Sequence, residues 1–412
     1  MTEHQPSPEA PDADAAALPL AGVRVVEFTH MVMGPTCGLI LADLGAEVIK
    51  VEPPVRGDNT RRLTGSGTGF FPTYNRNKKS LSIDIKSPEG RDAVLRLIET
   101  ADVFSENFRP GAMDDAGFGW EALSTRNPRL IYVSHKGFLD GPYTDRTALD
   151  EVVQMMAGLA YMTGLPGRPM RAGASVNDVM GGMFGAIGVL AALRRRDVTG
   201  RGELVTSGLF ENCVFLVGQH MAQAAMTGQP LKPMSVRTPA WGVYDIFDTA
   251  DGEQVFASVV TDQQWSVFCD SFDCGDLKAD RSLSSNAGRV AERERLIPQI
   301  AARLAAFDKQ TLIAKLDAAG LPYAEVNSPE AMRDDPHLRA SGGLLEVSVA
   351  EGVRAAVPAL PLSLDGARLG LRRDIPTIGA DGPEILASAG FEASEIDALA
   401  QSGVMSVTSA RR

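Results

Sequence analysis

Short apolar runs alternate with longer amphipathic stretches through the first third of the chain. Strands are expected over residues 23–28, 47–51, 78–85, 102–107 and 129–138. Between them, one helix follows a Gly-Pro turn and ends at Leu44, and another starts at Ser87 with Pro88 in its first turn. Strands that alternate with helices predict a Rossmann-like, doubly wound α/β domain with a parallel sheet.

The pattern changes at residue 150, and the chain is expected to be mostly helical from there to residue 226. Two alternating runs within 241–260 are joined by Ala250-Asp251-Gly252, which predicts a β-hairpin, and two helices follow it. The expected organisation is a disordered tail over 1–18, the first part of a large domain over 19–226, a linker over 227–240, a small α+β domain over 241–327, and a C-terminal segment over 328–412 that returns to the large domain.

The composition excludes several classes of partner. The 412 residues carry a net charge of −12, which argues against binding to nucleic acid or to an anionic membrane. The apolar run Val179–Leu193 is shorter than a membrane span and holds four glycines. The start of the chain has no secretory pattern, and the four cysteines form no CxxC pair, so we expect a cytoplasmic protein with reduced thiols and no metal site.

Familiar nucleotide and hydrolase motifs are missing from the expected places. No GxGxxG follows the first strand, no Walker-type loop is present, and there is no GxSxG elbow. No tightly bound cofactor is therefore expected. Basic residues do gather near the expected strand ends, where a phosphate-rich ligand binds in open α/β sheets.

Asp178 stands at the start of the long apolar run, and two interpretations of it are open. Aspartate is a favoured helix N-cap, so capping alone accounts for it. A carboxylate held ionised at a helix start also attacks an acyl carbon without a general base. In that case Gly181 and Gly182 would let a thioester approach the first turn closely.

An ordered set of segments now points to a known family. These are LAGVRVVEFTHMVMGP, LGAEVIKVEPP, NRNKKSLSIDIKSPEG, ENFRPGAM, NPRLIYVSHKGF and TGRGELV. The chain resembles the class III CoA-transferases (CaiB/BaiF type), the family of formyl-CoA transferase and carnitine CoA-transferase. The resemblance implies a large α/β domain, a small domain, and an interlocked homodimer in which each chain threads through the other.

The resemblance also implies a mechanism and its substrates. By position Asp178 matches the family nucleophile, which attacks an acyl-CoA donor to form an aspartyl-acyl anhydride and then an aspartyl-CoA thioester. Coenzyme A would pass from that thioester to a carboxylic acid acceptor. Backbone N–H groups at the start of the Asp178 helix, or from a mobile loop, would stabilise the oxyanion.

Contacts to coenzyme A carry over from the family by position. The residues expected to contribute are His30, Met31, Val32, Met33, Ile83, Lys86, Asn107, Phe108, Arg109, Arg146 and Asp150. Asp150 occupies the place of an acidic residue near the family's active site.

Departures from the family pattern bear on the substrate. Val32 and Leu149 replace a glutamine and a tyrosine of the formyl-CoA enzymes, so formate and oxalate are not expected. We expect a dicarboxylic acceptor such as succinate, mesaconate or itaconate, with Arg237 pairing with its distal carboxylate. Alternatives are an α-methylacyl-CoA racemase, whose histidine base is replaced by Leu149, and a non-catalytic protein that binds CoA esters.

Overall fold

The computed structural model describes residues 18–237, 239–350 and 352–408. The chain divides into two compact units. The first contains the residues up to Ser235 together with those from Pro336 onward, and the second is Val236–Asp335. The segment expected as a small domain, 241–327, lies inside the second unit. The expected tail over 1–18 lies, apart from Leu18, outside the described residues.

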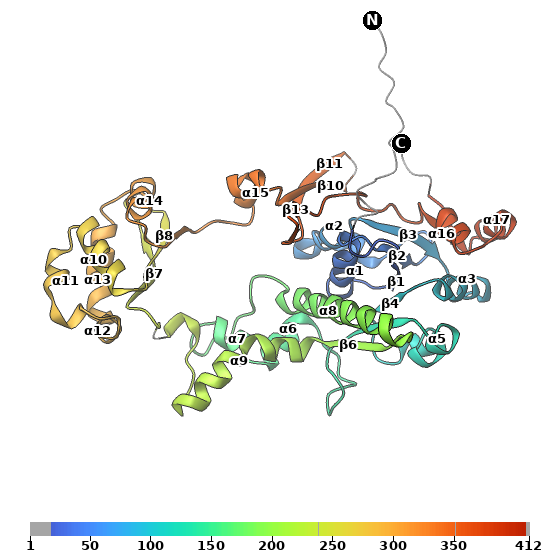
Figure 1. The fold of residues 1–412 in the computed structure, drawn as a ribbon, viewed down its shortest axis with the longest axis horizontal. Coiled ribbons are helices and arrows are strands. Elements are labelled where there is room, and N and C mark those ends of the chain that lie inside the picture. The colour runs from blue at the N-terminus through green and yellow to red at the C-terminus, as the bar shows by residue number, and fades with distance from the viewer. Residues whose placement is uncertain (1–17, 238, 351, 409–412) are drawn as a thin grey trace, which may run out of the picture. The chain divides into compact units, whose positions relative to one another are not determined.

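A seven-stranded sheet forms the centre of the first unit, in the order β14-β3-β2-β1-β4-β5-β6 (Figure 1). Its strands are β1 (Arg24–Phe28), β2 (Glu47–Glu52), β3 (Lys78–Ile83), β4 (Val103–Glu106), β5 (Ile131–Lys136), β6 (Leu204–Gly208) and β14 (Met405–Ser406). All neighbours pair in parallel except β14, which runs antiparallel to β3. The direction of winding reverses between β1 and β4, and ligands bind at this switch point in open α/β sheets.

The expected strands are present, with three differences. The strand expected over 78–85 ends at Ile83. β6 lies within the stretch expected to be helical, because a short edge strand with exposed Leu204 has little apolar periodicity to reveal it. β14 is only two residues long, so no pattern could predict it, and it makes the sheet mixed instead of parallel.

Helices cover both faces of this sheet. The first unit contains α1 (Met33–Asp43), α2 (Phe70–Tyr74), α3 (Pro88–Glu99), α4 (Ala112–Asp115), α5 (Trp120–Arg126), α6 (Asp150–Met156), α7 (Leu159–Thr163), α8 (Val176–Thr199), α9 (Leu209–Thr227), α15 (Pro336–Ala340), α16 (Gly382–Ser388) and α17 (Ala393–Gln401). Two hairpins complete it, β10 (Leu344–Ala350) with β11 (Val353–Pro358) and β12 (Ser363–Leu364) with β13 (Ala367–Arg368).

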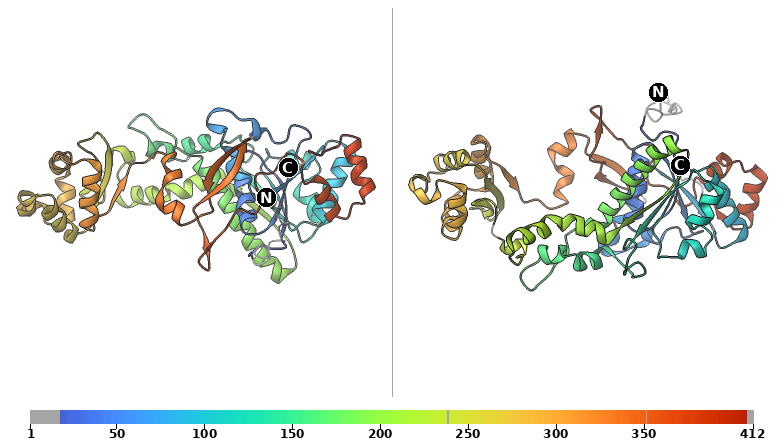
Figure 2. Two further views of the ribbon diagram at one scale, coloured as in Figure 1. Left: turned by 90° about the horizontal axis from the view of Figure 1, so that it is seen from above. Right: turned by 60° about the horizontal axis from the view of Figure 1, so that its bottom comes forward.

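Successive strand residues face opposite cores, as the pleat requires. Val25 points to the side where α1 and α8 pack, whereas Val26 points to the side of α3, α16 and α17. The C-terminal helices, drawn in red, lie beside α3 in Figure 1 and in both views of Figure 2. There the guanidinium of Arg96 forms an ion pair with Glu395 at 2.8 Å. The C-terminal helices α16 and α17 thus pack with α3 on the same face of the sheet.

The second unit has an antiparallel sheet with its own core. Its elements are β7 (Val243–Asp248), β8 (Gln254–Val259), β9 (Tyr323–Glu325), α10 (Asp262–Ser271), α11 (Gly275–Ala279), α12 (Asn286–Ala291), α13 (Arg293–Leu304) and α14 (Lys309–Ala318). The expected hairpin is confirmed, with Gly252 at a φ of 79° in its turn. The expectation of two helices was wrong: five are described, among them α11 and α12, which at five and six residues are too short to show a helical period.

α8 packs closely against α1 through its glycines. A Cβ on Gly182 would lie 2.5 Å from the carbonyl oxygen of Met33 and 2.6 Å from Thr36, and one on Gly181 would lie 2.4 Å from the Met33 side chain. α1 therefore packs directly on Gly181 and Gly182, and the approach of a thioester to this turn of α8 stays a prediction. Among the described helices, α8 has the length and hydropathy of a membrane span, yet this face is a packing surface of the α/β core.

Gly182→Ala should lower the free energy of unfolding by about 1–3 kcal/mol, because backbone of α1 has to move. The matched control is Gly218→Ala in α9, where an added Cβ would meet nothing within 4 Å. The control should be neutral or stabilise by up to about 1 kcal/mol through helix propensity. Thermal unfolding of the three proteins measures both changes, and equal midpoints for the two variants would contradict this packing.

Candidate active site

The loop from His30 to Met33 leaves the carboxyl end of β1 at the switch point of the sheet. Asn107, which follows β4, binds this loop twice: its Oδ1 accepts the His30 N–H at 3.0 Å, and its Nδ2 donates to the His30 carbonyl at 2.8 Å. The His30 and Phe108 rings lie 5.1 Å apart. The structure thus brings together His30, Met31, Asn107 and Phe108, which the sequence predicted as contacts to coenzyme A.

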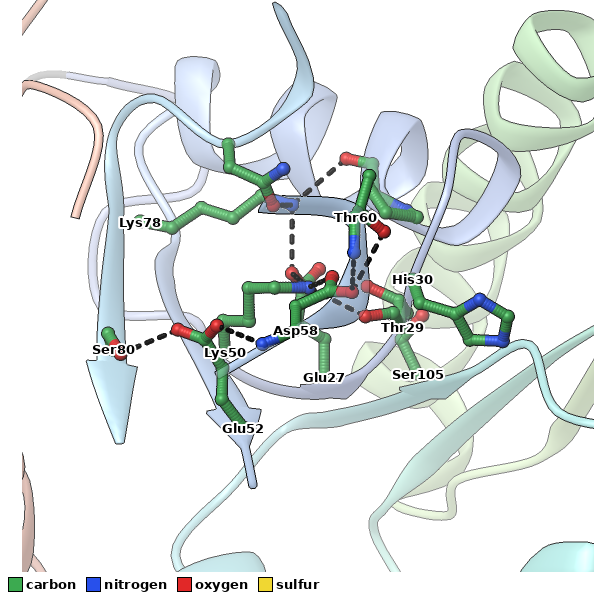
Figure 3. A network of polar contacts seen from close by, with 12 residues as sticks. Glu27, Thr29, His30, Lys50, Glu52, Asp58, Thr60, Lys78, Ser80 and Ser105 are labelled. Carbon is green, nitrogen blue, oxygen red and sulfur yellow. Dashed lines mark hydrogen bonds and ion pairs between the residues drawn. The ribbon is translucent and has the colours of Figure 1, made fainter. Parts of the chain in front are cut away.

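A buried polar network holds this loop in place (Figure 3). The Lys50 ammonium donates to the Thr29 carbonyl at 2.6 Å and pairs with Asp58 at 2.9 Å. Asp58 accepts from the N–H and the hydroxyl of Thr60, both at 2.8 Å. The Thr60 hydroxyl then accepts the N–H of Met31, whose φ is +61°. This chain of bonds holds Met31 in a strained backbone conformation.

The other predicted contacts to coenzyme A lie in different surroundings. The side chains of Val32, Met33 and Ile83 are buried in apolar cores, at 0%, 5% and 1% exposure, which leaves mainly their backbone to a ligand. Lys86 and Arg146 are exposed on loops. Arg109 is also exposed, 3.8 Å from Asp115.

Asp178 is the third residue of α8, and Ser175 is the N-cap. The sequence had placed the start of the helix at Asp178, and this placement was wrong. The cap comes from another helix: Asp150 Oδ1 accepts the N–H of Asn177 at 2.8 Å and that of Asp178 at 3.1 Å. Both amides are therefore engaged, and neither is open to stabilise an oxyanion, as had been expected.

Asp150 also secures the loop that precedes α8. Its Oδ2 accepts from the Gln154 amide at 2.5 Å, and the Gln154 oxygen accepts the N–H of Ala172 at 2.8 Å. The Arg171 guanidinium lies 3.8 Å from the same Asp150 oxygen. Asp150 is thus a buried carboxylate surrounded by donors, and it fixes both the loop and the first turn of α8.

The two carboxyl groups make Asp178 unlike an ordinary surface aspartate. Burial, followed by the negative charge of Asp150, raises the pKa of Asp178 from 3.8 to about 7, while Arg171 opposes the rise. We had expected the helix start to keep this carboxylate fully ionised. Burial and then the like charge of Asp150 outweigh that effect, and Asp150 also accepts the two N–H groups of the helix start.

Tyr74, at the end of α2, is a further residue at this site that the sequence analysis missed. Burial and the charge of Asp178 raise the pKa of its phenol, so the two side chains are within electrostatic reach. Nothing in the local pattern FFPTYN marks this tyrosine, because it is chain folding that brings α2 toward α8. Arg171 was also missed, although it precedes Asp178 by only seven residues.

Two further predictions concern Arg237 and the absence of a metal site. Arg237 belongs to the second unit, so its expected pairing with an acceptor carboxylate stays a prediction. Among the described residues no three His, Cys, Asp or Glu side chains gather as a metal site would require. All four cysteines are free and buried.

Comparison with known proteins agrees with this fold. The family described as CoA-transferase family III matches residues 20–382. Succinyl-CoA–D-citramalate CoA-transferase of Chloroflexus aurantiacus is 34% identical over 80% of this chain and 83% of its own. Succinate–glutarate CoA-transferase of Agrobacterium fabrum is 32% identical over 90% of this chain and 95% of its own. A CAIB/BAIF family protein from Brucella suis has the same fold, with a TM-score of 0.80 and 31% identity over 90% of this chain and 99% of its own.

The doubly wound sheet and these matches define an enzyme that acts on coenzyme A thioesters. The chain belongs to CoA-transferase family III.

Replacing Asp178 should show the energetic cost of its burial. The folded carboxyl binds its proton more tightly than the unfolded one, since its pKa is raised from 3.8 to about 7. The wild type should therefore lose stability relative to Asp178→Asn as the pH rises toward 7, by about 2 kcal/mol between pH 5 and pH 7, and no further above it. Denaturation of both proteins at pH 5, 7 and 8 measures this; a stability difference independent of pH would refute the coupling.

Proposed function

We propose that this enzyme transfers coenzyme A from an acyl-CoA donor to a dicarboxylic acid through covalent intermediates on Asp178. The observation that carries the proposal is the place of this carboxylate. Asp178 lies in the turn of α8 that precedes Gly181 and Gly182, and these glycines pack on Met33, where the switch-point loop becomes α1. A ligand held by that loop therefore has its reactive end beside Asp178.

The proposed chemistry begins with attack of the Asp178 carboxylate on the thioester carbon of the donor. The C–S bond breaks, leaving an aspartyl-acyl anhydride and CoA thiolate. The thiolate attacks the aspartyl carbonyl, which releases the donor acid and forms an aspartyl-CoA thioester. The acceptor carboxylate then attacks the aspartyl-CoA thioester, which releases CoA thiolate and forms an anhydride between Asp178 and the acceptor. The thiolate attacks the acceptor carbonyl of this anhydride, which yields the acceptor's CoA thioester and regenerates the Asp178 carboxylate. Water has to be excluded throughout, because it would hydrolyse the activated acyl group.

The partners of Asp178 fit this role. Its raised pKa marks a carboxylate that is poorly solvated, and such an anion is a stronger nucleophile once it is ionised. The amides at the start of α8 are occupied by Asp150. The N–H groups of Met33 and Gly34 at the start of α1 have no acceptor within their own helix, and we assign the stabilisation of the developing oxyanion to them.

A dicarboxylic acceptor is supported by the relatives. The two similar enzymes named above act, by their names, on D-citramalate and on glutarate, and both acids carry two carboxylates. Transfer is favoured over racemisation because Leu149, which replaces the histidine of the racemases, is 64% exposed and cannot exchange a proton. We further propose that the enzyme is cytoplasmic, in keeping with its free cysteines.

The test is a panel of acyl-CoA donors against carboxylic acids, followed by mass spectrometry. Asp178→Ala should lower the rate of transfer at least about 10³-fold, since no other group replaces the nucleophile. Hydroxylamine added with the donor should modify the wild type at Asp178. The matched control is Asp145→Ala on an exposed loop, which should retain full activity. Undiminished transfer by Asp178→Ala would refute the mechanism.

The rate of the first half-reaction should depend on pH through Asp178. Only the ionised carboxylate attacks, so release of CoA thiolate in a single turnover should rise about tenfold per pH unit below about 7 and level off above it. Rapid quenching between pH 5 and pH 8.5 measures this. A rate that is flat between pH 5 and pH 7 would contradict an aspartate with a raised pKa.

We propose a homodimer, as the family resemblance implied. The outer face of α8 exposes Met183, Ile187 and Leu190, and the adjoining α9 exposes Phe215 and Leu216. Exposed apolar faces of this extent mark association surfaces, and a second copy of the chain is the partner that we assign to them.

Ile187→Glu should place a charge in this surface and lower the share of protein recovered at twice the monomer mass of 43.8 kDa, because interlocked chains whose shared surface carries a charge assemble poorly; the wild type should be recovered at the doubled mass. Light scattering after size-exclusion chromatography measures the mass. Val353→Glu, on the exposed hairpin strand β11, is the control and should leave the dimer intact. A monomeric wild type, or a dimer that Ile187→Glu leaves unchanged, would contradict the assignment.

A further inference from the structure

Arg171 is a cation beside the two carboxylates of the active site. It lies in the loop between α7 and α8, and its side chain is 38% exposed. Its Nε donates to the carbonyl of Ala172 at 3.1 Å. Its terminal nitrogens lie 3.8 Å from Asp150 and 3.7 Å from Glu151. Both distances exceed hydrogen-bond length, so the two ends of the guanidinium keep donors for another acceptor.

The surroundings leave room for such an acceptor. Four small residues, Ala172 to Ser175, separate Arg171 from the start of α8, and Gly173 and Ala174 among them are exposed. A Cβ placed on Gly173 would meet nothing within 4 Å. The loop beside the guanidinium is therefore built from small residues, and the space around Gly173 is open.

The negative charge of this site means that binding of an acidic substrate needs a nearby cation. Asp178, Asp150 and Glu151 already bring three carboxyl groups to this site, and the Tyr74 phenol adds no positive charge. An incoming acid adds one or two more negative charges in a poorly solvated place, which is unfavourable without a counter-ion. Arg171 supplies positive charge that already acts on Asp178, since it lowers the pKa of that carboxyl.

Position decides which carboxylate Arg171 binds. Asp150 separates it from Asp178: Oδ2 of Asp150 faces Arg171 at 3.8 Å, and Oδ1 accepts the Asp178 N–H at 3.1 Å. The Asp150 carboxylate thus lies between the guanidinium and the backbone of Asp178. A reacting carboxylate also needs free lone pairs, which a two-pronged arginine contact would occupy.

We propose that Arg171 binds the distal, non-reacting carboxylate of a short dicarboxylic substrate and so determines the preference for diacids. The inference rests on the proposed function of Asp178. It assigns to Arg171 the role that the sequence alone had given to Arg237. Arg171 releases its long contacts to Asp150 and Glu151 and forms a paired hydrogen bond with the substrate.

The experiment compares acids that differ in a single charge. Succinate and glutarate are each assayed against their monoamides, with the wild type, Arg171→Gln and Arg171→Lys. Arg171→Gln should raise KM for the diacids about tenfold to a hundredfold with kcat changed less, and should alter kcat/KM for the monoamides less than about threefold. Arg171→Lys should restore part of the diacid KM, because it returns the charge without the planar fork.

Two controls separate this subsite from other causes. Arg168→Gln removes the same charge from an exposed position in the same loop and should leave every constant unchanged. Arg237→Gln tests the competing assignment. Equal losses for diacids and monoamides in Arg171→Gln would show that Arg171 only supports the fold, and a diacid-specific loss in Arg237→Gln alone would move the subsite there. Either result overturns the proposal.

Calorimetry distinguishes a failed subsite from a failed transferase mechanism. Succinate, glutarate and their monoamides are each titrated into the full-length wild type and into Arg171→Lys. Coenzyme A is present, and no acyl-CoA donor is added, so binding is measured without turnover. A preference for diacids that weakens in Arg171→Lys supports the subsite even if Asp178 proves dispensable for transfer. A wild type that binds each diacid no better than its monoamide overturns the subsite, whatever the fate of the mechanism.

Discussion

The carboxylate of Asp150 occupies the N-terminus of α8, where water or a residue of the same helix would otherwise satisfy the open amides. This single contact joins α6, the loop before α8 and the first turn of α8. It also places a second negative charge beside Asp178. The electrostatic character of the site follows: Asp178 is held in place and poorly solvated, and a neighbouring carboxylate raises its pKa toward neutrality. Arg171 balances the charge at the edge of the same cluster.

A second constraint fixes the loop at the switch point of the sheet. The reversal of strand order between β1 and β4 opens the sheet where His30 and Asn107 meet. The buried ions Lys50 and Asp58 stabilise the unusual backbone at Met31 by way of Thr60. Breaking such a pair by removing one partner costs about 3–5 kcal/mol, so Lys50 and Asp58 together hold the loop firmly in place. Close packing of α8 glycines on α1 then sets the distance from this loop to Asp178.

The sequence was sufficient to predict the strands and helices whose apolar residues follow a clear pattern. The strands around Val26, Ile49 and Val133 are short runs rich in buried apolar residues, and the helix that starts at Pro88 has a clear N-cap at Ser87, so both could be predicted. The order of family segments pointed to Asp178 and to the loop at His30. It could not show that Asp150 caps α8, because 27 residues separate the partners of that bond. Tyr74 was missed for the same reason. Arg171 is near Asp178 in the sequence but distant from its ion-pair partner Asp150, and the packing of Gly181 and Gly182 on α1 likewise joins segments far apart in the chain.

In the proposed mechanism, Asp178 exchanges an oxygen atom with the acids that it activates. In the proposed sequence, the acceptor carboxylate leaves one of its oxygens on the aspartate in each turnover. Acceptor labelled with ¹⁸O in its carboxylates should therefore add 2 Da, and with repeated turnover up to 4 Da, to the peptide that contains Asp178, located by fragmentation mass spectrometry. Turnover that leaves this peptide unlabelled, while coenzyme A is transferred, would contradict the central role of Asp178.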